Sequence, residues 1–208
     1  MKTEINIETW NRKDHYELFS KFSEPFCGIC TNVDCTKAYS EAKEKKISFY
    51  LYYLYLSLKA ANEIKEFKYR IEDGKVYCYD FIHAAPTVDR EDGTFGFSIL
   101  NYSEDMNEFM NASKIVNERV RKESGLDLSY TGCDVIHYTV FPWAPITSIS
   151  HPRHFGFEDS IPKISFGKYF EENGKKKLPV AVHVNHALAD GYHIGKYLQL
   201  FQKLLDGN

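Results

Sequence analysis

Apolar residues recur every three or four positions in several stretches of the chain, which is the spacing of amphipathic helices. The first such helix is expected to begin near Asn11. Within it, Tyr16, Phe19 and Phe22 fall on one side. The stretch 48–64 is aromatic on nearly every face, which predicts a well-buried helix. The other predicted helices are a lysine- and glutamate-rich one at 36–46, a long one that Ser103 can cap and that runs to about Lys122, and a C-terminal one that includes Ile194 and Leu205.

Strand patterns lie between these helices, and two of them are paired by short turn signals. Asp73-Gly74 and Asn173-Gly174 are the dipeptides expected in two-residue hairpin turns. The predicted strands are the hairpins 68–71 with 76–79 and 164–170 with 178–184, and the single strands 5–7, 95–100 and 135–143.

The order of these elements predicts the fold class. Helices interleaved with hairpins indicate an α/β (α+β) two-layer sandwich, a mixed sheet with helices packed on it, rather than a Rossmann sheet. With 208 residues and no repeat, low-complexity tract or linker, the chain is expected to form one domain over 1–208. The sequence contains no G-x-G-x-x-G or Walker motif, so no motif supports nucleotide-dependent chemistry.

Composition and charge narrow the range of partners. The formal net charge of −3 gives no basic field, so we expect no nucleic-acid partner. The longest apolar run, 47–58, is shorter than the roughly 20 residues that a membrane span requires, so we expect no membrane partner. The first eight residues lack the apolar core of a secretion signal, which predicts a cytoplasmic protein.

Five cysteines, an odd number, favour free thiols over a disulfide framework. Cys27 and Cys30 have C-x-x-C spacing. A redox or zinc site would need a nucleophilic cysteine at a helix start, or a second pair of ligands. Neither is visible, so these thiols are expected to lie in the core or to line a pocket, and no metal site is predicted.

The segment 186–191, with the pattern H-x-x-x-D-G, is the strongest candidate for chemistry. Val180, Val182 and Val184 precede it at period two, which predicts a strand, and the C-terminal helix follows. A histidine at the end of a strand can be held rigidly, and imidazole titrates near neutrality, so His186 can accept a proton from a substrate. The alternative is a hydrogen-bonded structural imidazole.

Short motifs in a fixed order extend this signal over almost the whole chain. They are Trp10-Asn-Arg12-Lys-Asp-His15-Tyr16, Phe49-Tyr50, Asp80-Phe-Ile-His83 with Thr87-Val88, Thr94-Phe95, Pro142-Trp143, Phe166-Gly-Lys-Tyr169 and Asn185-His186-Ala-Leu-Ala-Asp190-Gly-Tyr-His193. In kind and in order, they resemble the motifs of the type A chloramphenicol acetyltransferases.

This resemblance implies an activity, a co-substrate and an assembly. It implies O-acetyl transfer from acetyl-CoA as co-substrate, with no permanently bound cofactor, no metal and no acyl-enzyme. It implies a homotrimer with its active sites between subunits, one supplying the histidine and the next much of the acceptor pocket. The partners would be acetyl-CoA and a small hydroxyl-bearing acceptor, with chloramphenicol, and hence antibiotic resistance, as the leading hypothesis.

The resemblance also implies roles for individual residues. His186 matches the general base, and Thr139 stands where the family has a serine that stabilises the oxyanion. Asp190 and Arg12 match a structural ion pair that braces the loop of the base. The remaining implied positions are Phe19, Phe95, Ile149 and Ser165 in the acceptor pocket, and Tyr169 and Lys168 on the coenzyme side.

The chain departs from the family pattern mainly around the acceptor. Asn185 replaces the first histidine of H-H-x-x-x-D-G, and strand alternation puts Asn185 and His183 on the face opposite His186. Ile146 and Ile149 replace two phenylalanines, and the neighbouring His151 falls where the family is apolar. Further departures are the segment 22–29, which aligns poorly, and Ser48, which replaces a lysine on the coenzyme side.

Three alternatives remain open on the sequence alone. The first keeps the chemistry but changes the acceptor to another hydroxyl compound. The second is a non-catalytic trimeric ligand-binding homologue, against which the joint retention of His186, Asp190 and Arg12 speaks. The third is a catalytic domain of the dihydrolipoamide acyltransferases, which also carry H-x-x-x-D-G, but no lipoyl or linker region is seen in these 208 residues.

Overall fold

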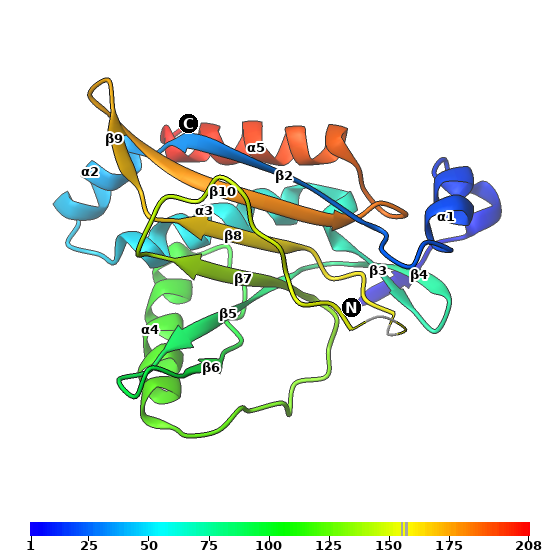
Figure 1. Ribbon diagram of the computed structural model, residues 1–208, viewed down its shortest axis with the longest axis horizontal. Helices are drawn as coiled ribbons and strands as arrows, with labels where there is room; N and C mark the ends of the chain where they lie inside the picture. The colour runs from blue at the N-terminus through cyan, green and yellow to red at the C-terminus, as the bar shows by residue number, and fades with distance from the viewer. Residues whose placement is uncertain (155, 157) are drawn as a thin grey trace.

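A mixed β-sheet forms the centre of the computed structural model, which describes residues 1–154, 156 and 158–208. Its strands are β2 (Phe26–Asp34), β5 (His83–Asp89), β6 (Phe95–Phe97), β7 (Val135–Phe141), β8 (Lys163–Gly167), β9 (Phe170–Glu172) and β10 (Lys175–Asn185). They lie in the order β2-β10-β8-β7-β5-β6, and β9 pairs with the first part of β10 (Figure 1). β7 is parallel to β5 and to β8, whereas the other pairs are antiparallel.

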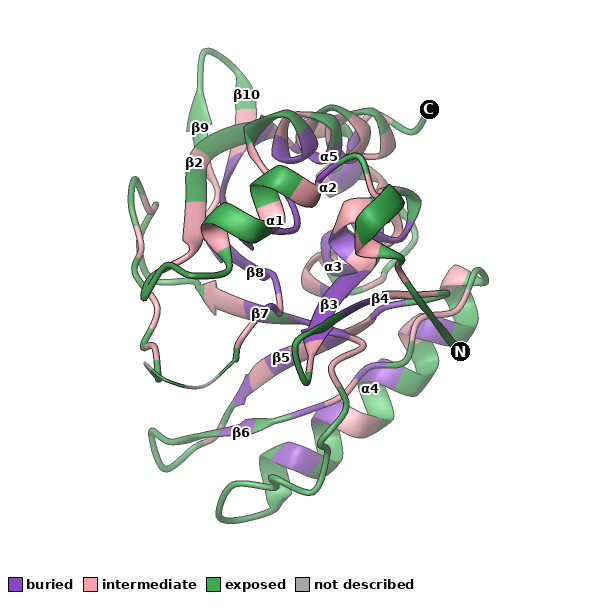
Figure 2. Cartoon of the chain, turned by 90° about the vertical axis from the view of Figure 1, so that its right-hand side faces the viewer, coloured by how far each residue is buried: buried purple, intermediate pink, exposed green. Residues whose placement is uncertain are grey.

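Helices cover one side of this sheet. They are α2 (Thr36–Glu44), α3 (Phe49–Glu63), α4 (Met106–Lys122) and α5 (Gly191–Leu205). The helix α1 (Lys13–Phe19) and the short 3-10 helices η1 (Ile7–Thr9) and η2 (Lys65–Lys68) lie at the end of the molecule that holds the smaller sheet (Figure 1). In Figure 2, α3, α4 and α5 lie on one side of the sheet, and the loop that follows β7 lies on the other. This arrangement is the two-layer α/β sandwich that the sequence predicts.

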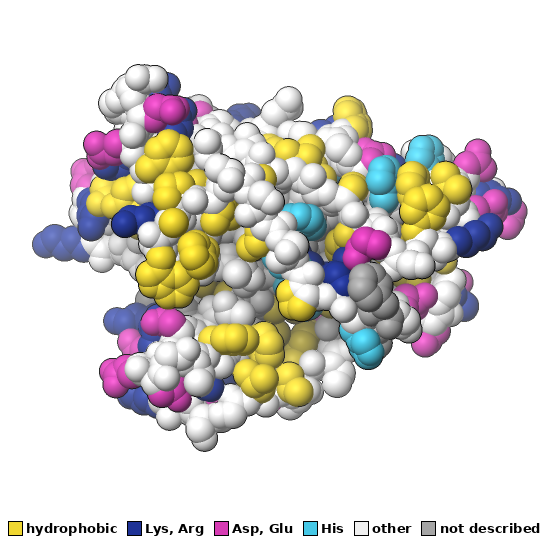
Figure 3. Space-filling view, in the orientation of Figure 1, with side chains coloured by type: hydrophobic (Ala, Val, Ile, Leu, Met, Phe, Trp, Pro, Cys, Tyr) yellow, Lys and Arg dark blue, Asp and Glu magenta, His cyan; other side chains and the backbone are white. Residues whose placement is uncertain are grey.

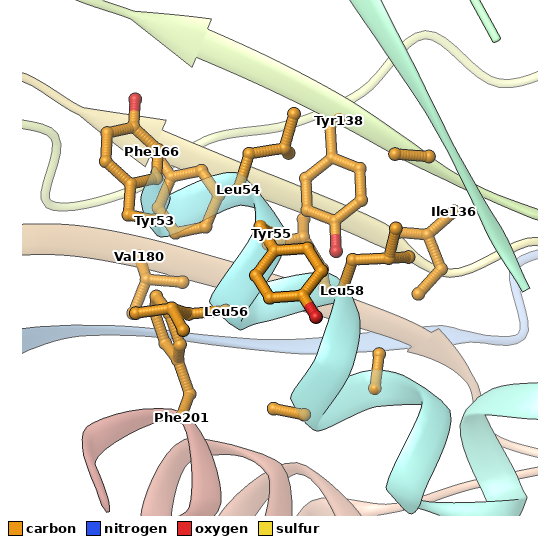
Figure 4. Packing of buried hydrophobic residues seen from close by; sticks show 14 of the residues in the cluster. Tyr53, Leu54, Tyr55, Leu56, Leu58, Ile136, Tyr138, Phe166, Val180 and Phe201 are labelled. Carbon is orange, nitrogen blue, oxygen red and sulfur yellow. The ribbon is translucent and has the colours of Figure 1, made fainter. Parts of the chain in front are cut away.

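The main core lies between the sheet and helices α3 and α5 (Figure 4). Alternate strand residues such as Ile164 and Phe166 face these helices, because successive side chains of a strand point to opposite faces. Within this core the hydroxyl of Ser57 lies 3.0 Å from that of Tyr138 and 2.6 Å from that of Tyr197, so the buried hydroxyls are paired. One face of each central strand is thus used for stability, and the other face is left for function.

A second, smaller core anchors the turn after β10. A three-stranded sheet has the order β1-β4-β3, with β1 at Lys2–Glu4, β4 at Lys75–Tyr79 and β3 at Tyr69–Glu72. Its apolar residues pack with Ala187 and Leu188 of the turn, and Trp10 and Phe19 from the N-terminal segment pack against the same cluster. The H-x-x-x-D-G segment is therefore buried against residues from near the start of the chain.

Local sequence signals mark several elements correctly. The Ser48 hydroxyl accepts a hydrogen bond from the Leu51 N–H at 3.3 Å and caps α3. Asp73 and Gly74 have φ angles of 50° and 72°, and Asn173 and Gly174 have 51° and 74°. Positive φ at both central residues is typical of the predicted hairpin turns.

Two other predictions are wrong: the residue that caps α4 and the position of the first strand. α4 is capped by Asp105, whose carboxylate accepts from the N–H of Asn107 at 2.7 Å and of Glu108 at 3.3 Å, and not by Ser103. The strand expected at 5–7 lies at 2–4 instead. Ile5 and Ile7 pack against the smaller core, where their apolar character is used without a strand.

The predicted strand 164–170 is interrupted. β8 ends at Gly167 and β9 begins at Phe170. The intervening Lys168 donates its N–H to the carbonyl of Ala144 at 3.0 Å, so at this point the chain bonds to the loop after β7. β10 consequently pairs first with β9 and then with β8.

Candidate active site

His186 lies in the tight turn between β10 and α5, and its backbone is held from both sides. The side-chain oxygen of Asn185 accepts the N–H of Ala187 at 3.0 Å, and its amide donates to the carbonyl of Asp159 at 3.1 Å. The N–H of His186 donates to the carbonyl of Pro25 at 2.8 Å. Asn185 therefore orders the turn that presents the candidate base.

An ion pair from the N-terminal segment braces the same turn. The Arg12 guanidinium donates to the Asp190 carboxylate at 2.7 Å and to the carbonyl oxygen of His186 at 3.1 Å. Asp190 also caps α5 by accepting the N–H of Tyr192 at 3.0 Å. Partial burial opposes ionisation of the Asp190 carboxyl, but the Arg12 hydrogen bond and the nearby His193 lower its pKa to about 2. Asp190 is thus a fixed anion that joins Arg12 to the turn.

The imidazole of His186 is stacked on the ring of Phe19. The ring centroids are 4.0 Å apart and the planes differ by 10°. The Nδ1 atom of His186 is buried and has no hydrogen-bond partner in the part of the chain that the structure describes. Stacking on Phe19 therefore orients the imidazole. Phe19, which was predicted for the acceptor pocket, lies directly against the candidate base.

Phe19→Ala is expected to lower kcat by up to about tenfold, because an aromatic pair contributes about 1 kcal/mol beyond burial and holds the imidazole in one orientation. Phe19→Tyr keeps the ring and is expected to remain within about twofold of wild type. Steady-state thiol release at saturating acetyl-CoA measures both values. An alanine variant with unchanged kcat would contradict a positioning role.

Thr139 and Ser165 lie side by side on the sheet face that the helices leave open. Thr139 pairs with Ser165, and Ser165 pairs with Ala181 of β10. Their neighbours Tyr138 and Phe166 point into the main core. Strand alternation consequently directs Thr139 and Ser165 to the opposite, open face.

Thr139 and His186 are far apart within one chain. Ala181, the β10 residue in register with Ser165, precedes His186 by five residues, roughly 16 Å at the rise of an extended strand. Thr139 lies two strands away from β10. Figure 1 shows β7 and β10 ending at opposite ends of the sheet. A single chain does not bring the two candidate groups together.

The other predicted pocket residues are also dispersed. Phe95 lies on β6, at the edge of the sheet remote from β10, and is 49% exposed. Ile149 lines a hollow of about 260 Å³ between β2, β10 and the loop after β7, together with Gly28 and His183. The single chain thus separates Phe95 from the end of the molecule that holds Phe19.

The residues predicted for the coenzyme side form a separate aromatic group. The Tyr169 hydroxyl donates to that of Tyr39 at 3.4 Å, and both rings lie near Phe49. The Nζ atom of Lys176 lies 4.7 Å from the centre of the Tyr39 ring. Lys168 is exposed beside this group.

With this geometry established, comparison with known proteins assigns the family. The model of the chloramphenicol acetyltransferase family matches residues 1–202. The chain belongs to the chloramphenicol acetyltransferase family. It is therefore an acyltransferase, as predicted.

Individual members of this family match over nearly their full length. A chloramphenicol acetyltransferase of Proteus mirabilis is 27% identical over 97% of this chain and 94% of its own length. A solved chloramphenicol acetyltransferase structure is 29% identical, with a TM-score of 0.91, over 99% of this chain and 100% of its own. A dihydrolipoamide acetyltransferase of Azotobacter vinelandii shares the fold, with a TM-score of 0.66, 15% identity, and coverage of 92% of this chain and 85% of its own.

The C-x-x-C motif of this chain lies on the strand β2. Cys27 and Cys30 are both on β2, three residues apart, so they point to opposite faces of the sheet. Both are free thiols, and burial raises the pKa of each. Cys30 lines the hollow near His183, and Cys27 packs against the main core, in agreement with the expected core and pocket-lining roles.

Among residues 1–154, 156 and 158–208, no group of three or more histidine, cysteine, aspartate or glutamate side chains is placed to hold a metal ion. Within the same residues, no helix combines the length and apolarity needed to cross a bilayer.

The sequence alone did not single out Lys163. This lysine lies on the open face beside Ser165, pairs with His183 across the strands, and is only 6% exposed. Alternation of polar residues at 163 and 165, and at 137 and 139, is the signal that marks this face. It becomes informative only when the strand register is known.

Proposed function

We propose that this protein transfers the acetyl group of acetyl-CoA to a hydroxyl group of a small acceptor, directly and within a ternary complex. The observation that carries the proposal is the bracing of His186: Arg12 donates to its carbonyl oxygen at 3.1 Å and to Asp190 at 2.7 Å. Curated relatives with 25–27% identity are named chloramphenicol acetyltransferases, so chloramphenicol is the first acceptor to test.

In the proposed reaction, His186 removes the proton of the acceptor hydroxyl while that oxygen attacks the thioester carbonyl carbon. The hydroxyl of Thr139 donates a hydrogen bond to the resulting oxyanion, a contribution typically worth ~3 kcal/mol. The C–S bond then breaks, and the imidazolium returns its proton to the sulfur of coenzyme A. Asp190 takes no proton, because its partners hold its pKa at about 2.

We further propose that the active site forms between subunits of a homotrimer. The separation of Thr139 from His186 within one chain supports this, because another copy must then supply the second group. Exposed aromatic side chains at the β6–β7 end of the sheet offer a contact surface, and hydrophobic side chains are visible on this face in Figure 3. The exposed aromatic side chains at this end of the sheet are Phe95, Phe97, Phe141 and Trp143, which are 49%, 40%, 42% and 72% exposed.

The coenzyme is placed beside Tyr169 and Tyr39 in this proposal. Their rings, 5.2 Å apart, offer aromatic surface to an adenine, and the exposed Lys168 offers positive charge to phosphate groups. The protein supplies no covalent acyl carrier, and acetyl-CoA acts as co-substrate.

The first test measures thiol release from acetyl-CoA with and without chloramphenicol, together with the mass of the product. We expect acceptor-dependent release and a product heavier by one acetyl group. If the protein is folded and trimeric but gives no release, chloramphenicol is not its acceptor. Release with another hydroxyl compound would then identify the first alternative.

Subunit mixing tests the shared site. His186→Ala and Thr139→Val chains are each expected to be nearly inactive alone. Co-expressed in equal amounts, they should recover roughly a quarter of wild-type activity, because a quarter of random interfaces join an intact His186 to an intact Thr139. Failure to recover activity in mixed trimers would place both groups in one chain.

A further inference from the structure

The open sheet face around Thr139 carries two rows of side chains that follow directly from the strand register. The first row runs Thr139, Ser165, Ala181 and Cys30 across β7, β8, β10 and β2. The second row, two residues away along the strands, runs His137, Lys163, His183 and Gly28. The surface next to the proposed oxyanion donor is therefore largely polar.

Three buried polar atoms on this face have no hydrogen-bond partner among the described residues. They are Oγ of Ser165, Nδ1 of His183 and Nε2 of His151. Ser165 is only 1% exposed, and the rings of His151 and His183 lie 5.0 Å apart, edge to face. Buried polar atoms are nearly always paired in folded proteins, so an unpaired group of three indicates a missing hydrogen-bond partner.

The ring of His183 is packed closely against β2, and the residue also borders a hollow. A Cβ atom on Gly28 would lie 2.2 Å from Cδ2 of His183, so the ring lies over the strand only because this residue is a glycine. His183 also borders the hollow of about 260 Å³, where Thr147 and Ser148 add hydroxyl groups. Histidine side chains reach the surface on this face of the molecule (Figure 3).

The charged groups near these atoms are already paired. Lys163 contacts the Asp159 carboxylate at 2.7 Å, and Arg153 contacts Glu24 at 3.0 Å and Asp159 at 3.8 Å. Both cations also lie over the ring of Phe26. The two positive and two negative charges balance, so the face offers no unpaired charge to a ligand.

The histidines on this face are neutral at cellular pH. Burial, followed by the proximity of His183 and Lys163, lowers the pKa of His151 to about 4. Burial and then Lys163 and Arg153 lower the pKa of His183. A neutral imidazole has one donor and one acceptor nitrogen, which suits it to bind hydroxyl groups.

We propose that the acceptor is a neutral, hydroxyl-rich compound of the sugar or polyol class, bound through Ser165, His183 and His151. This inference rests on the proposed acetyl transfer and specifies its substrate. One hydroxyl of the acceptor is acetylated next to Thr139, while its other hydroxyls form hydrogen bonds with the three unpaired atoms. Chloramphenicol has two hydroxyl groups, one of which would be acetylated, and a large aromatic ring, so it pairs fewer of these atoms than a polyol does, which disfavours its binding.

The test compares kcat/KM for methyl α-glucoside, sorbitol and chloramphenicol in wild type and in Ser165→Ala and His151→Leu. The kcat/KM of wild type should be higher for at least one of the two polyols than for chloramphenicol. Each variant should show a kcat/KM about tenfold lower on that polyol, which is the typical effect of one hydrogen bond. On chloramphenicol the same variants should lose clearly less than on that polyol. The matched control is Asn32→Ala, a polar-to-apolar change at an exposed position of β2 that does not line the hollow. It should leave kcat/KM unchanged for the polyol and for chloramphenicol.

Other results would overturn the proposal in distinguishable ways. Turnover of chloramphenicol without turnover of either polyol would refute the acceptor class and leave acetyl transfer intact. No thiol release with any of the three acceptors would refute both. Loss of the trimer in Ser165→Ala or His151→Leu, measured as mass in solution, would assign the unpaired atoms to a subunit contact and not to an acceptor.

Discussion

Replacing His186 with alanine is expected to lower kcat by roughly 10²–10⁴-fold, the usual contribution of a general base. Without the imidazole, no group in the braced turn can remove the acceptor proton as the oxygen attacks. The change removes neither acceptor-face nor coenzyme-side residues, so KM should change much less than kcat. Thiol release over a range of both substrate concentrations separates the two parameters.

The matched control for this variant is His15→Ala. His15 lies on α1, in the same N-terminal segment as Arg12 and Phe19, but its side chain is exposed. This variant should keep wild-type kcat. If His186→Ala is folded and trimeric and still turns over at the wild-type rate, His186 is not the base, and the non-catalytic alternative or another proton acceptor must be considered.

Removing Arg12 is expected to have the largest effect on stability. Arg12→Met leaves the Asp190 carboxylate without its 2.7 Å partner and the His186 carbonyl without its donor. Breaking a buried pair from one side typically costs roughly 3 kcal/mol or more, because the remaining charge is stranded. Urea unfolding measures the loss, and kcat should fall with it because the turn loses its brace. Lys13→Ala removes an exposed ion pair with Glu8 and should leave both values almost unchanged.

The same pair predicts how stability depends on pH. The pKa of Asp190 is about 2 in the folded chain, below its ordinary value of 3.8. The ionised carboxylate therefore stabilises the fold fully above about pH 4, and this contribution is lost as the pH falls toward 2. Asp190→Asn should reduce the acid sensitivity of wild type in this window. An unchanged pH profile in the asparagine variant would show that the pair does not contribute in this way.

The elements that could be predicted from the sequence are those whose causes lie within a few residues. Ser48 marks the start of α3, and Asp73-Gly74 marks a hairpin turn, because each acts on its own backbone. The start of α4 shows the limit of such signals. Ser103 and Asp105 both carry a capping oxygen, and only the path of the backbone decides that Asp105 is the cap.

The candidate site depends on contacts between distant segments, so only part of it could be predicted. Arg12 and Asp190 are 178 positions apart, and their pairing was expected through family resemblance rather than through any local pattern. The polar row beside Thr139 arises from the register of separate strands. Alternation predicts that Ser165 and His183 occupy strand faces, but the neighbours they meet across the sheet depend on the fold.

The wide separation of β2 and β10 along the sequence has a consequence for synthesis on the ribosome. In the described sheet β2 pairs with β10 alone, and 140 residues lie between the end of β2 at Asp34 and the start of β10 at Lys175. A nascent chain must therefore carry β2 unpaired until β10 has emerged. Arg12 gains its carboxylate partner later still, when Asp190 emerges. The turn of the candidate base can be held in place only after both steps, so a chain truncated before β10 leaves β2 unpaired and Arg12 without its carboxylate.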